Sequence, residues 1–90
     1  MRKRKAKRVE QYEHPVYLDA QARLAETLLK LRHDRGWTQA TASERCEMDF
    51  THYGNLERRR HNPTLVTLAR LAVGFEVDIE VFLRSVHKNV

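Results

Sequence analysis

The chain has 90 residues, a formal net charge of +5 and a single cysteine, Cys46. A chain of this length can bury one small core, so we expect one domain, and a lone cysteine excludes an internal disulfide framework and a cysteine-rich zinc site. The charged N-terminus is not followed by an apolar run of signal-peptide or membrane-spanning length. We therefore expect a soluble, cytoplasmic protein with no membrane partner.

The positive charge is concentrated near the N-terminus, in Arg2, Lys3, Arg4, Lys5, Lys7 and Arg8. Removing these six from the 17 Lys and Arg leaves 11 against 12 Asp and Glu, so the rest of the chain carries a charge of about −1. Because like charges repel and the segment up to Tyr17 contains Pro15 and no periodicity, residues 1–17 are predicted to be a flexible basic arm and linker. Such an arm either contacts phosphates or only keeps the protein soluble.

Residues 18–84 are predicted to form a domain of short helices. The first helix is expected to begin near Asp19 and to stop at Gly36, since helices commonly end at a glycine. Its apolar residues recur at i, i+4 and i+7, which places them on one face: Leu24, Leu28 and Leu31.

Two further helices follow, separated by a short turn at residues 47–49. Thr38 can cap the second helix over about 39–46, and Asp49 can cap the third over about 50–58. The apolar spacing turns the following residues inward: Ala42 and Cys46 in the second helix, and Tyr53 and Leu56 in the third. This arrangement predicts two short helices packed on the first.

The last two helices are predicted from their caps and apolar spacing. Thr64 can cap a fourth helix that ends around Phe75, and Asp78 can cap a short fifth helix. Residues 85–90 are left as a C-terminal tail. The apolar residues expected inside are Leu65, Leu68, Leu71, Ala72, Ile79, Phe82 and Leu83. With no strand predicted, the fold class is all-α.

The outward face of the third helix is small, polar and cationic, with Thr51, Gly54, Asn55 and Arg58. A glycine inside a helix costs about 1 kcal/mol relative to alanine. Either Gly54 allows the helix backbone to approach a nucleic acid closely, or the helix merely tolerates it. The first alternative predicts that this face lies against DNA.

Two helices joined by a three-residue turn, with polar side chains exposed on the second, form the layout of a helix-turn-helix. From about Leu24 to Leu83 the chain resembles the Cro/C1-type (XRE) helix-turn-helix family of bacterial and phage regulators. The matching segments are LLKLRHDRGWTQ (28–39), NLERRRHNPTL (55–65) and TLARLAVGFEVDIEVFL (67–83). The resemblance implies a five-helix bundle of the lambda-repressor-like type, whose second and third helices contact DNA.

The resemblance also implies roles for individual residues. The positions that read base edges correspond to Phe50, Thr51, Gly54 and Asn55. Gln39, at the start of the second helix, would hold a DNA phosphate. Arg32 and Glu57 occupy the positions of an ion pair that is common in the family and links the first helix to the third.

Side-chain chemistry suits these base-reading roles. The Asn55 amide can both donate to and accept from adenine, and Thr51 can hydrogen-bond or place its methyl near a thymine methyl. Phe50 either contacts that methyl or lies partly buried beside the apolar stripe.

Beyond the third helix, four residues are assigned to the DNA backbone: Arg58, Arg60, His61 and Asn62. The alternative for the arginines is a solvated helix end, where cations favour the helix dipole. The alternative for Asn62 is a loop or cap residue before Pro63.

The chain departs from the family pattern at four positions. Glu47, Arg59 and Glu76 stand where glycine is frequent, and Ser43 stands where alanine is usual. A residue other than glycine with a positive φ is strained. The departure at Glu47 therefore puts the geometry of the turn in question.

These observations predict a sequence-specific transcriptional regulator, a repressor, that binds double-stranded DNA as a homodimer and is associated with the nucleoid. No cofactor is expected, and the five histidines form no metal-ligand spacing, so we expect no metal site and no enzyme. The alternative is an antitoxin or other interaction module of the same fold, which binds a protein partner and regulates its own operon. Its apolar candidates, Val81, Val86 and Val90, fit a homodimer contact equally well.

Overall fold

The computed structural model describes residues 14–84 of the chain. Its helices are α2 (Pro15–Arg35), α3 (Gln39–Arg45), α4 (Phe50–Glu57), α5 (Leu65–Phe75) and α6 (Glu80–Leu83), and residues 14–84 contain no strand. The predicted all-α fold with five helices is therefore confirmed. The predicted basic arm at residues 2–8 and the tail at residues 85–90 lie outside the described residues.

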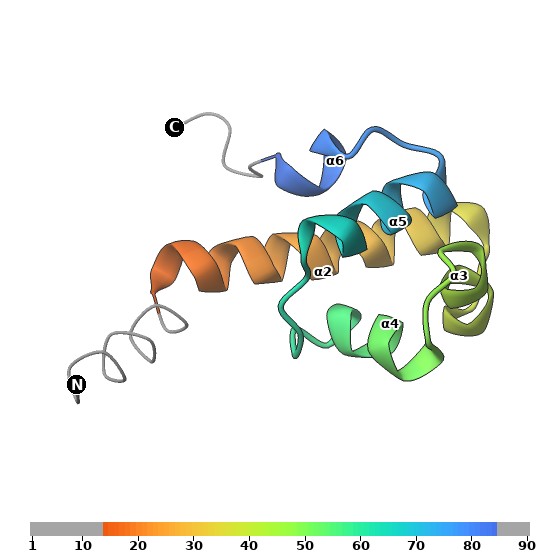
Figure 1. The fold of residues 1–90 in the computed structure, drawn as a ribbon, viewed down its shortest axis with the longest axis horizontal. Helices are drawn as coiled ribbons and strands as arrows, with labels where there is room; N and C mark the ends of the chain where they lie inside the picture. The colour runs from red at the N-terminus through yellow and green to blue at the C-terminus, as the bar shows by residue number, and fades with distance from the viewer. Residues whose placement is uncertain (1–13, 85–90) are drawn as a thin grey trace.

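Helix α2 is the long central element of the fold, as Figure 1 shows. It packs against α4 and α6, while α3 packs against α4 and α5. In Figure 1, α6 lies on one side of α2 and α4 on the other, while α5 crosses in front of α2. The core fills the space between these helices, and α3 and α4 are carried at one end of α2.

Helix α2 begins at Pro15, so the predicted start near Asp19 is wrong. His14 has an extended backbone and its Nδ1 accepts a hydrogen bond from the Val16 N–H at 3.1 Å. Proline is suited to the first position of a helix, where its missing N–H has no partner to lose. Pro15 therefore starts a helix here instead of marking a linker. At the other end, Gly36 has a φ of 68° and stops the helix as predicted.

Three of the four predicted caps are confirmed. The side chains of Thr38, Asp49 and Thr64 each accept a backbone N–H of the helix that follows. The prediction for Asp78 is wrong, because α6 begins after Ile79 without any side-chain cap. Asp78 instead contributes its main-chain carbonyl, which accepts from the Val81 N–H at 3.0 Å.

The apolar residues that the periodicity placed inside lie in the core or pack against it, with two exceptions. Leu83 is 58% exposed, so its predicted inward position is wrong; the four-residue α6 turns only one face, that of Phe82, to the core. Leu65, at the start of α5, is also exposed. The residues that form the core are Leu24, Leu28, Ala42, Cys46, Tyr53, Leu56, Leu68, Leu71, Ala72, Phe75 and Phe82.

Three positions where the family often has glycine adopt the left-handed conformation in this chain. The φ angles are 53° at Glu47, 62° at Arg59 and 58° at Glu76. Residues other than glycine thus adopt the backbone conformation that glycine usually supplies at such turns. Each such residue costs on the order of 1–2 kcal/mol, so the rest of the fold holds these turns against local strain.

Gly74 has a packing role that the sequence did not indicate. A Cβ built on Gly74 would lie 2.5 Å from Sγ and 2.7 Å from Cα of Cys46. The absence of a side chain therefore lets α5 approach the end of α3 closely. A Cβ on Gly54, by contrast, would meet only the flexible end of Arg58, at 3.0 Å from Nη2.

We expect Gly74→Ala to lower the free energy of unfolding by about 1–3 kcal/mol, because the added methyl meets backbone atoms that cannot move independently. Gly54→Ala is the matched control. It should leave stability unchanged or raise it by up to about 1 kcal/mol, through the higher helix propensity of alanine. Urea denaturation of both variants measures the difference, and equal stabilities would contradict the close approach at Gly74.

We expect Glu76→Gly to raise the free energy of unfolding by up to about 1 kcal/mol. Relief of the left-handed strain is partly offset by the greater freedom of glycine in the unfolded chain. Glu76→Ala removes the same side chain but keeps the strain, so it should give no gain. Thermal unfolding followed by circular dichroism distinguishes the two variants, and an equal gain in both would assign the effect to the lost carboxylate.

Candidate nucleic-acid interface

Helices α3 and α4 meet across a tight turn at residues 46–49. The Met48 N–H donates to the Ser43 carbonyl at 2.8 Å, and the Glu47 N–H donates to the Glu44 carbonyl at 3.1 Å. The turn therefore closes although Glu47 has a positive φ. Tyr53 and Leu56 point from α4 into the core and fix the rotation of that helix. The opposite face of α4 is consequently directed outward.

The predicted base-reading residues lie on α4 as the resemblance implies, but they differ in exposure. Phe50 is 54% exposed and lies outside the core cluster, so part of its ring is available for an outside contact. Thr51 is exposed, and its N–H is held by the Asp49 carboxylate at 3.0 Å. Asn55 is half-buried, and its Oδ1 accepts from Nη2 of Arg58 at 3.3 Å.

Gly54 is buried in this structure, and a close approach of its backbone to DNA stays a prediction. Arg58 follows it by one helical turn, and residues spaced by four are neighbours on a helix surface. The Arg58 guanidinium lies over Gly54, with Nη2, Nη1 and Cζ at 3.0, 3.3 and 3.4 Å from the position a Cβ would take. Arg58 was predicted to extend to the DNA backbone, and here it folds along α4.

A buried carboxylate joins three of the helices behind this face. Glu57 of α4 accepts from Arg32 of α2 in a two-pronged pair, at 2.8 Å from Nε and 3.1 Å from Nη2. Its carboxylate also accepts from Nε2 of Gln39 in α3 at 2.8 Å and from the Tyr53 hydroxyl at 2.6 Å. The structure thus contains the implied ion pair between Arg32 and Glu57. We call these four residues the Glu57 cluster.

The hydrogen bonds of the Glu57 cluster decide its ionisation. Burial by itself would raise the pKa of Glu57, but hydrogen bonds from Arg32, Tyr53 and Gln39 outweigh it and hold that pKa below the usual value. The bond to Glu57 raises the pKa of Arg32, and burial raises the pKa of the Tyr53 hydroxyl. Glu57 is therefore a carboxylate and Arg32 a cation throughout the neutral range.

Two members of the Glu57 cluster have roles that sequence reasoning missed. Tyr53 was treated as an apolar core residue, although its spacing of four from Glu57 could have indicated the contact. Gln39 was assigned to a DNA phosphate, and here one amide N–H is used by Glu57. A side-chain amide has two N–H donors, so the second remains for another acceptor.

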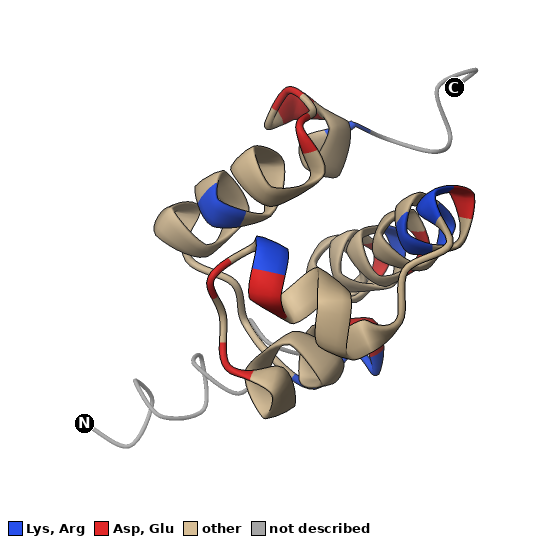
Figure 2. Ribbon diagram, turned by 90° about the vertical axis from the view of Figure 1, so that its right-hand side faces the viewer, with Lys and Arg blue, Asp and Glu red and all other residues tan. Residues whose placement is uncertain are grey.

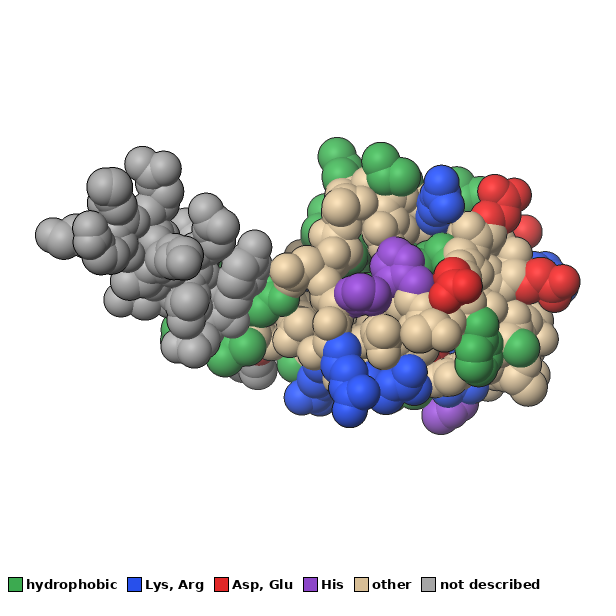
Figure 3. Space-filling model, turned by 60° about the horizontal axis from the view of Figure 1, so that its bottom comes forward, with side chains coloured by type: hydrophobic (Ala, Val, Ile, Leu, Met, Phe, Trp, Pro, Cys, Tyr) green, Lys and Arg blue, Asp and Glu red, His purple; other side chains and the backbone are tan. Residues whose placement is uncertain are grey.

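The segment after α4 folds back along the helix. The Arg60 N–H donates to the Asn55 carbonyl at 2.8 Å, and the side chains of Arg58, Arg59 and Arg60 are all exposed. His61 packs its ring edge-on against His52 of α4, with ring centroids 4.5 Å apart. Figure 3 shows histidine side chains next to a group of basic side chains on one face.

Asn62, the last residue assigned to the DNA backbone, is exposed but has a partner. Its Oδ1 accepts from the hydroxyl of Tyr17 in α2. This bond ties the loop to the start of α2, so the structure supports the alternative role of Asn62 as a loop residue.

Charge is mixed over the helices, and Figure 2 shows acidic and basic positions on the same elements. Within residues 14–84 no group of three or more His, Cys, Asp or Glu could hold a metal ion. No helix in this range is long and apolar enough to cross a membrane.

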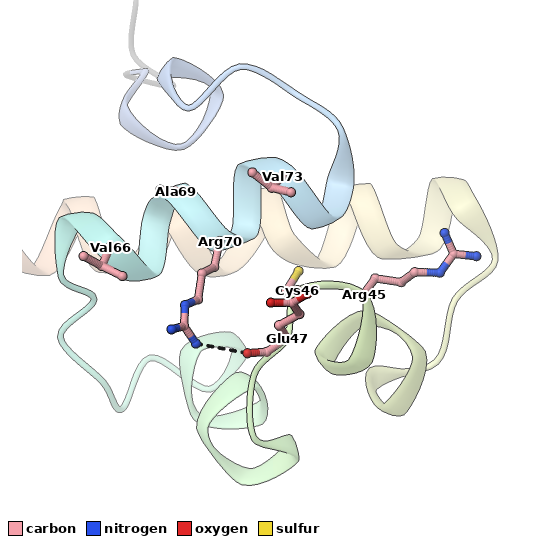
Figure 4. Close-up of a pocket in the computed structure, with 7 residues that line it drawn as sticks. All are labelled: Arg45, Cys46, Glu47, Val66, Ala69, Arg70 and Val73. Atoms are coloured by element: carbon pink, nitrogen blue, oxygen red, sulfur yellow. Dashed lines mark hydrogen bonds between the residues drawn. The ribbon is translucent and has the colours of Figure 1, made fainter.

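A second surface feature is a groove of about 290 Å³ between α5 and the turn that follows α3, shown in Figure 4. Val66 and Val73 of α5 line it and are 63% and 76% exposed. Arg70 crosses the groove and donates from Nη1 to the Glu47 carbonyl at 3.1 Å. This bond from α5 helps to hold the strained turn.

We expect Glu57→Gln to lower the free energy of unfolding at pH 7 by about 3 kcal/mol, because it leaves Arg32 without its charged partner. The folded pKa of Glu57 is below its unfolded value of about 4.3. Its stabilisation is therefore complete above that pH and is lost as the pH falls through the folded pKa. Urea denaturation at several pH values should show the gap between wild type and variant shrinking below about pH 4.

Asp34→Asn is the control for this prediction. Asp34 pairs with Lys30 on the surface at 3.3 Å, and exposed pairs of this kind contribute about 0.5 kcal/mol or less. A gap for Glu57→Gln that stays constant down to pH 3 would show that ionisation of Glu57 does not stabilise the fold.

Comparison with known proteins agrees with this geometry. Residues 23–82 match the family described as helix-turn-helix domain. The HTH-type transcriptional regulator SutR of Escherichia coli (strain K12) is 33% identical over 60 residues, which are 67% of this chain and 34% of that regulator. The chain thus spans about a third of the length of this curated relative.

Solved structures share the fold. NHTF, a hypothetical transcription factor from Neisseria, has a TM-score of 0.73 and 27% identity, covering 79% of this chain and 82% of that one. The restriction-modification controller protein C.AhdI from Aeromonas hydrophila has a TM-score of 0.66 and covers 69% of this chain and 94% of that one; at 24% identity the likeness is one of fold. The chain therefore belongs to the Cro/C1-type (XRE) helix-turn-helix family of transcriptional regulators.

Proposed function

We propose that the chain is a sequence-specific regulator that binds double-stranded DNA and represses transcription by occupying an operator. The observation that carries this proposal is the outward face of α4, which has an exposed Phe50 and Thr51 and the amide of Asn55 on a helix held rigidly from behind. The major groove admits an α-helix and presents a distinct pattern of donors and acceptors for each base pair. A few side chains on one rigid helix can therefore select a sequence.

Rigidity of the reading helix matters because base recognition depends on position. The Asp49 carboxylate fixes the start of α4 by accepting from the N–H groups of Thr51 and His52. The Glu57 cluster fixes its end to α2 and α3. Helix α4 therefore enters a groove as one body with α3, whose N-terminus offers backbone N–H groups to a phosphate beside Gln39.

Affinity in this proposal comes largely from contacts with phosphates. We assign those contacts to Gln39, Arg60 and His61 of the described domain and to the basic arm at residues 2–8. Each neutralised phosphate releases counterions, so log affinity falls by about 0.9 per unit of log salt for each contact. Because residues 9–90 carry a charge of about −1, the arm is the main source of this term.

We further propose that the chain acts as a homodimer in the cytoplasm, at the nucleoid. A dimer would read two half-sites about one helical turn apart, which makes the operator a palindrome. A two-fold site also doubles the number of base contacts that a small domain can offer.

An interaction module of the antitoxin type is the second candidate. The exposed valines along the α5 groove favour it, since such side chains suit a protein contact. Of the three valines considered earlier for this role, Val81 is half-buried and the other two lie outside the described residues.

Selection from a random duplex library at near-physiological salt tests the DNA-binding proposal. We expect enrichment of a palindromic site by the wild-type chain and loss of that enrichment in Asn55→Ala. Removal of residues 1–8 should keep the selected sequence but reduce the slope of log affinity against log salt by several units. The control is Asp34→Asn, a surface change on α2 that should leave both quantities unaltered.

Two results would contradict the proposal in different ways. Enrichment of no sequence, with binding that disappears when residues 1–8 are removed, would mean that only the arm binds DNA, and would favour the interaction module. An unchanged salt slope after the truncation would show that the arm does not contact DNA. The proposal that helix α4 reads the bases would not be affected.

A further inference from the structure

We infer that Arg58 reads a base edge, that of a guanine, and that Gly54 is small so that the Arg58 guanidinium can lie flat on α4. This inference rests on the proposed function and changes the assignment made from the sequence: Arg58 moves from the DNA backbone to the bases. It also gives Asn55 a positioning role beside Arg58.

The Arg58 guanidinium packs against its own helix, at Gly54. Gly54 lies one turn before Arg58, and Nη2, Nη1 and Cζ of Arg58 lie 3.0 to 3.4 Å from where a Cβ on residue 54 would stand. Those distances leave no room for a methyl group unless the guanidinium moves. Nη2 also donates to Oδ1 of Asn55 at 3.3 Å, which directs the planar group along the outward face of α4.

The charge on Arg58 has no partner of its own in the described part of the chain. Arg58 takes part in none of the ion pairs found there, and the adjacent Glu57 carboxylate is already occupied by Arg32, Gln39 and Tyr53. A guanidinium has five N–H donors, and the bond to Asn55 uses one. The others remain to bind acceptors in front of α4.

An arginine held against its own helix is suited to contact with a base. Contact with a phosphate does not require the side chain to be held in this way. A flexible, solvated cation is sufficient at the DNA backbone, and Arg60 is of that kind: it is exposed, with no side-chain hydrogen bond or ion pair found within residues 14–84. Guanine instead presents two acceptors, O6 and N7, side by side in the major groove, and the planar fork of a guanidinium held on α4 matches them.

Asn55 changes its role for the same reason. A bidentate contact with adenine requires both the oxygen and the nitrogen of the amide. Its Oδ1 accepts from Arg58, and this bond turns the amide toward the guanidinium and leaves Oδ1 only one lone pair for a base. Asn55 therefore positions the guanidinium, and the pair reads one G·C base pair in each half-site.

The test uses the duplex selected by the wild-type chain, with each base pair of the half-site changed in turn, and compares Gly54→Ala, Arg58→Ala and Arg60→Ala. Gly54→Ala keeps every charge, and it should fold, because the added methyl meets only the mobile end of Arg58. Circular dichroism checks that each variant is folded before binding is measured.

We expect both Gly54→Ala and Arg58→Ala to lose the preference for G·C at one and the same position, by about ten-fold or more, and to keep their preferences elsewhere. Arg60→Ala should weaken binding to all duplexes alike and lower the salt slope by about one unit. A uniform loss in Arg58→Ala, or an unchanged preference in Gly54→Ala, would overturn the inference and return Arg58 to the phosphates. A wild-type chain that selects no sequence would overturn the proposed function as well.

Discussion

The buried carboxylate of Glu57 is the interaction on which the rest of this structure depends. It lies where α2, α3 and α4 meet and accepts hydrogen bonds from one side chain of each. A carboxylate removed from water is unfavourable unless its lone pairs are satisfied, and here four donor atoms satisfy them. The same hydrogen bonds therefore hold the three helices together and keep the Glu57 carboxylate ionised.

The turns of this domain show how a fold can hold a left-handed backbone at residues other than glycine. Glu47, Arg59 and Glu76 all have positive φ, a conformation that glycine adopts most readily. Long-range bonds such as that from Arg70 to the Glu47 carbonyl hold one of these turns in place. Local strain is thus opposed by packing between elements that are distant in sequence.

The two glycines inside helices illustrate different uses of a missing side chain. At Gly74 the space is filled by the backbone and sulfur of Cys46, so the glycine serves the core. At Gly54 it is filled by the guanidinium of Arg58, so the glycine serves the surface that faces outward. In the sequence both appear as the same defect in a helix, because helix propensity depends on the residue and not on its neighbour across the fold.

The sequence by itself determined the elements of this protein. Periodicity placed Leu24, Leu28, Tyr53 and Leu56 inside, and the caps at Thr38, Asp49 and Thr64 followed from local hydrogen bonding. These features depend on contacts within a few residues, so they can be inferred from spacing alone. The resemblance to a known family added the pair of Arg32 and Glu57, which spacing could not supply.

Only the tertiary structure decided what depends on contacts between distant residues or on the rotamers of long side chains. The hydrogen bonds of Tyr53 and Gln39 to Glu57 depend on contacts between elements of the fold. The position of Arg58 over Gly54 depends on the rotamer of a long side chain. The start of α2 at Pro15 was missed for a local reason, since a proline that begins a helix and one that interrupts a chain look alike without the backbone of His14. Side-chain direction and distance are set by packing in three dimensions, and the spacing of residues along the chain does not contain them.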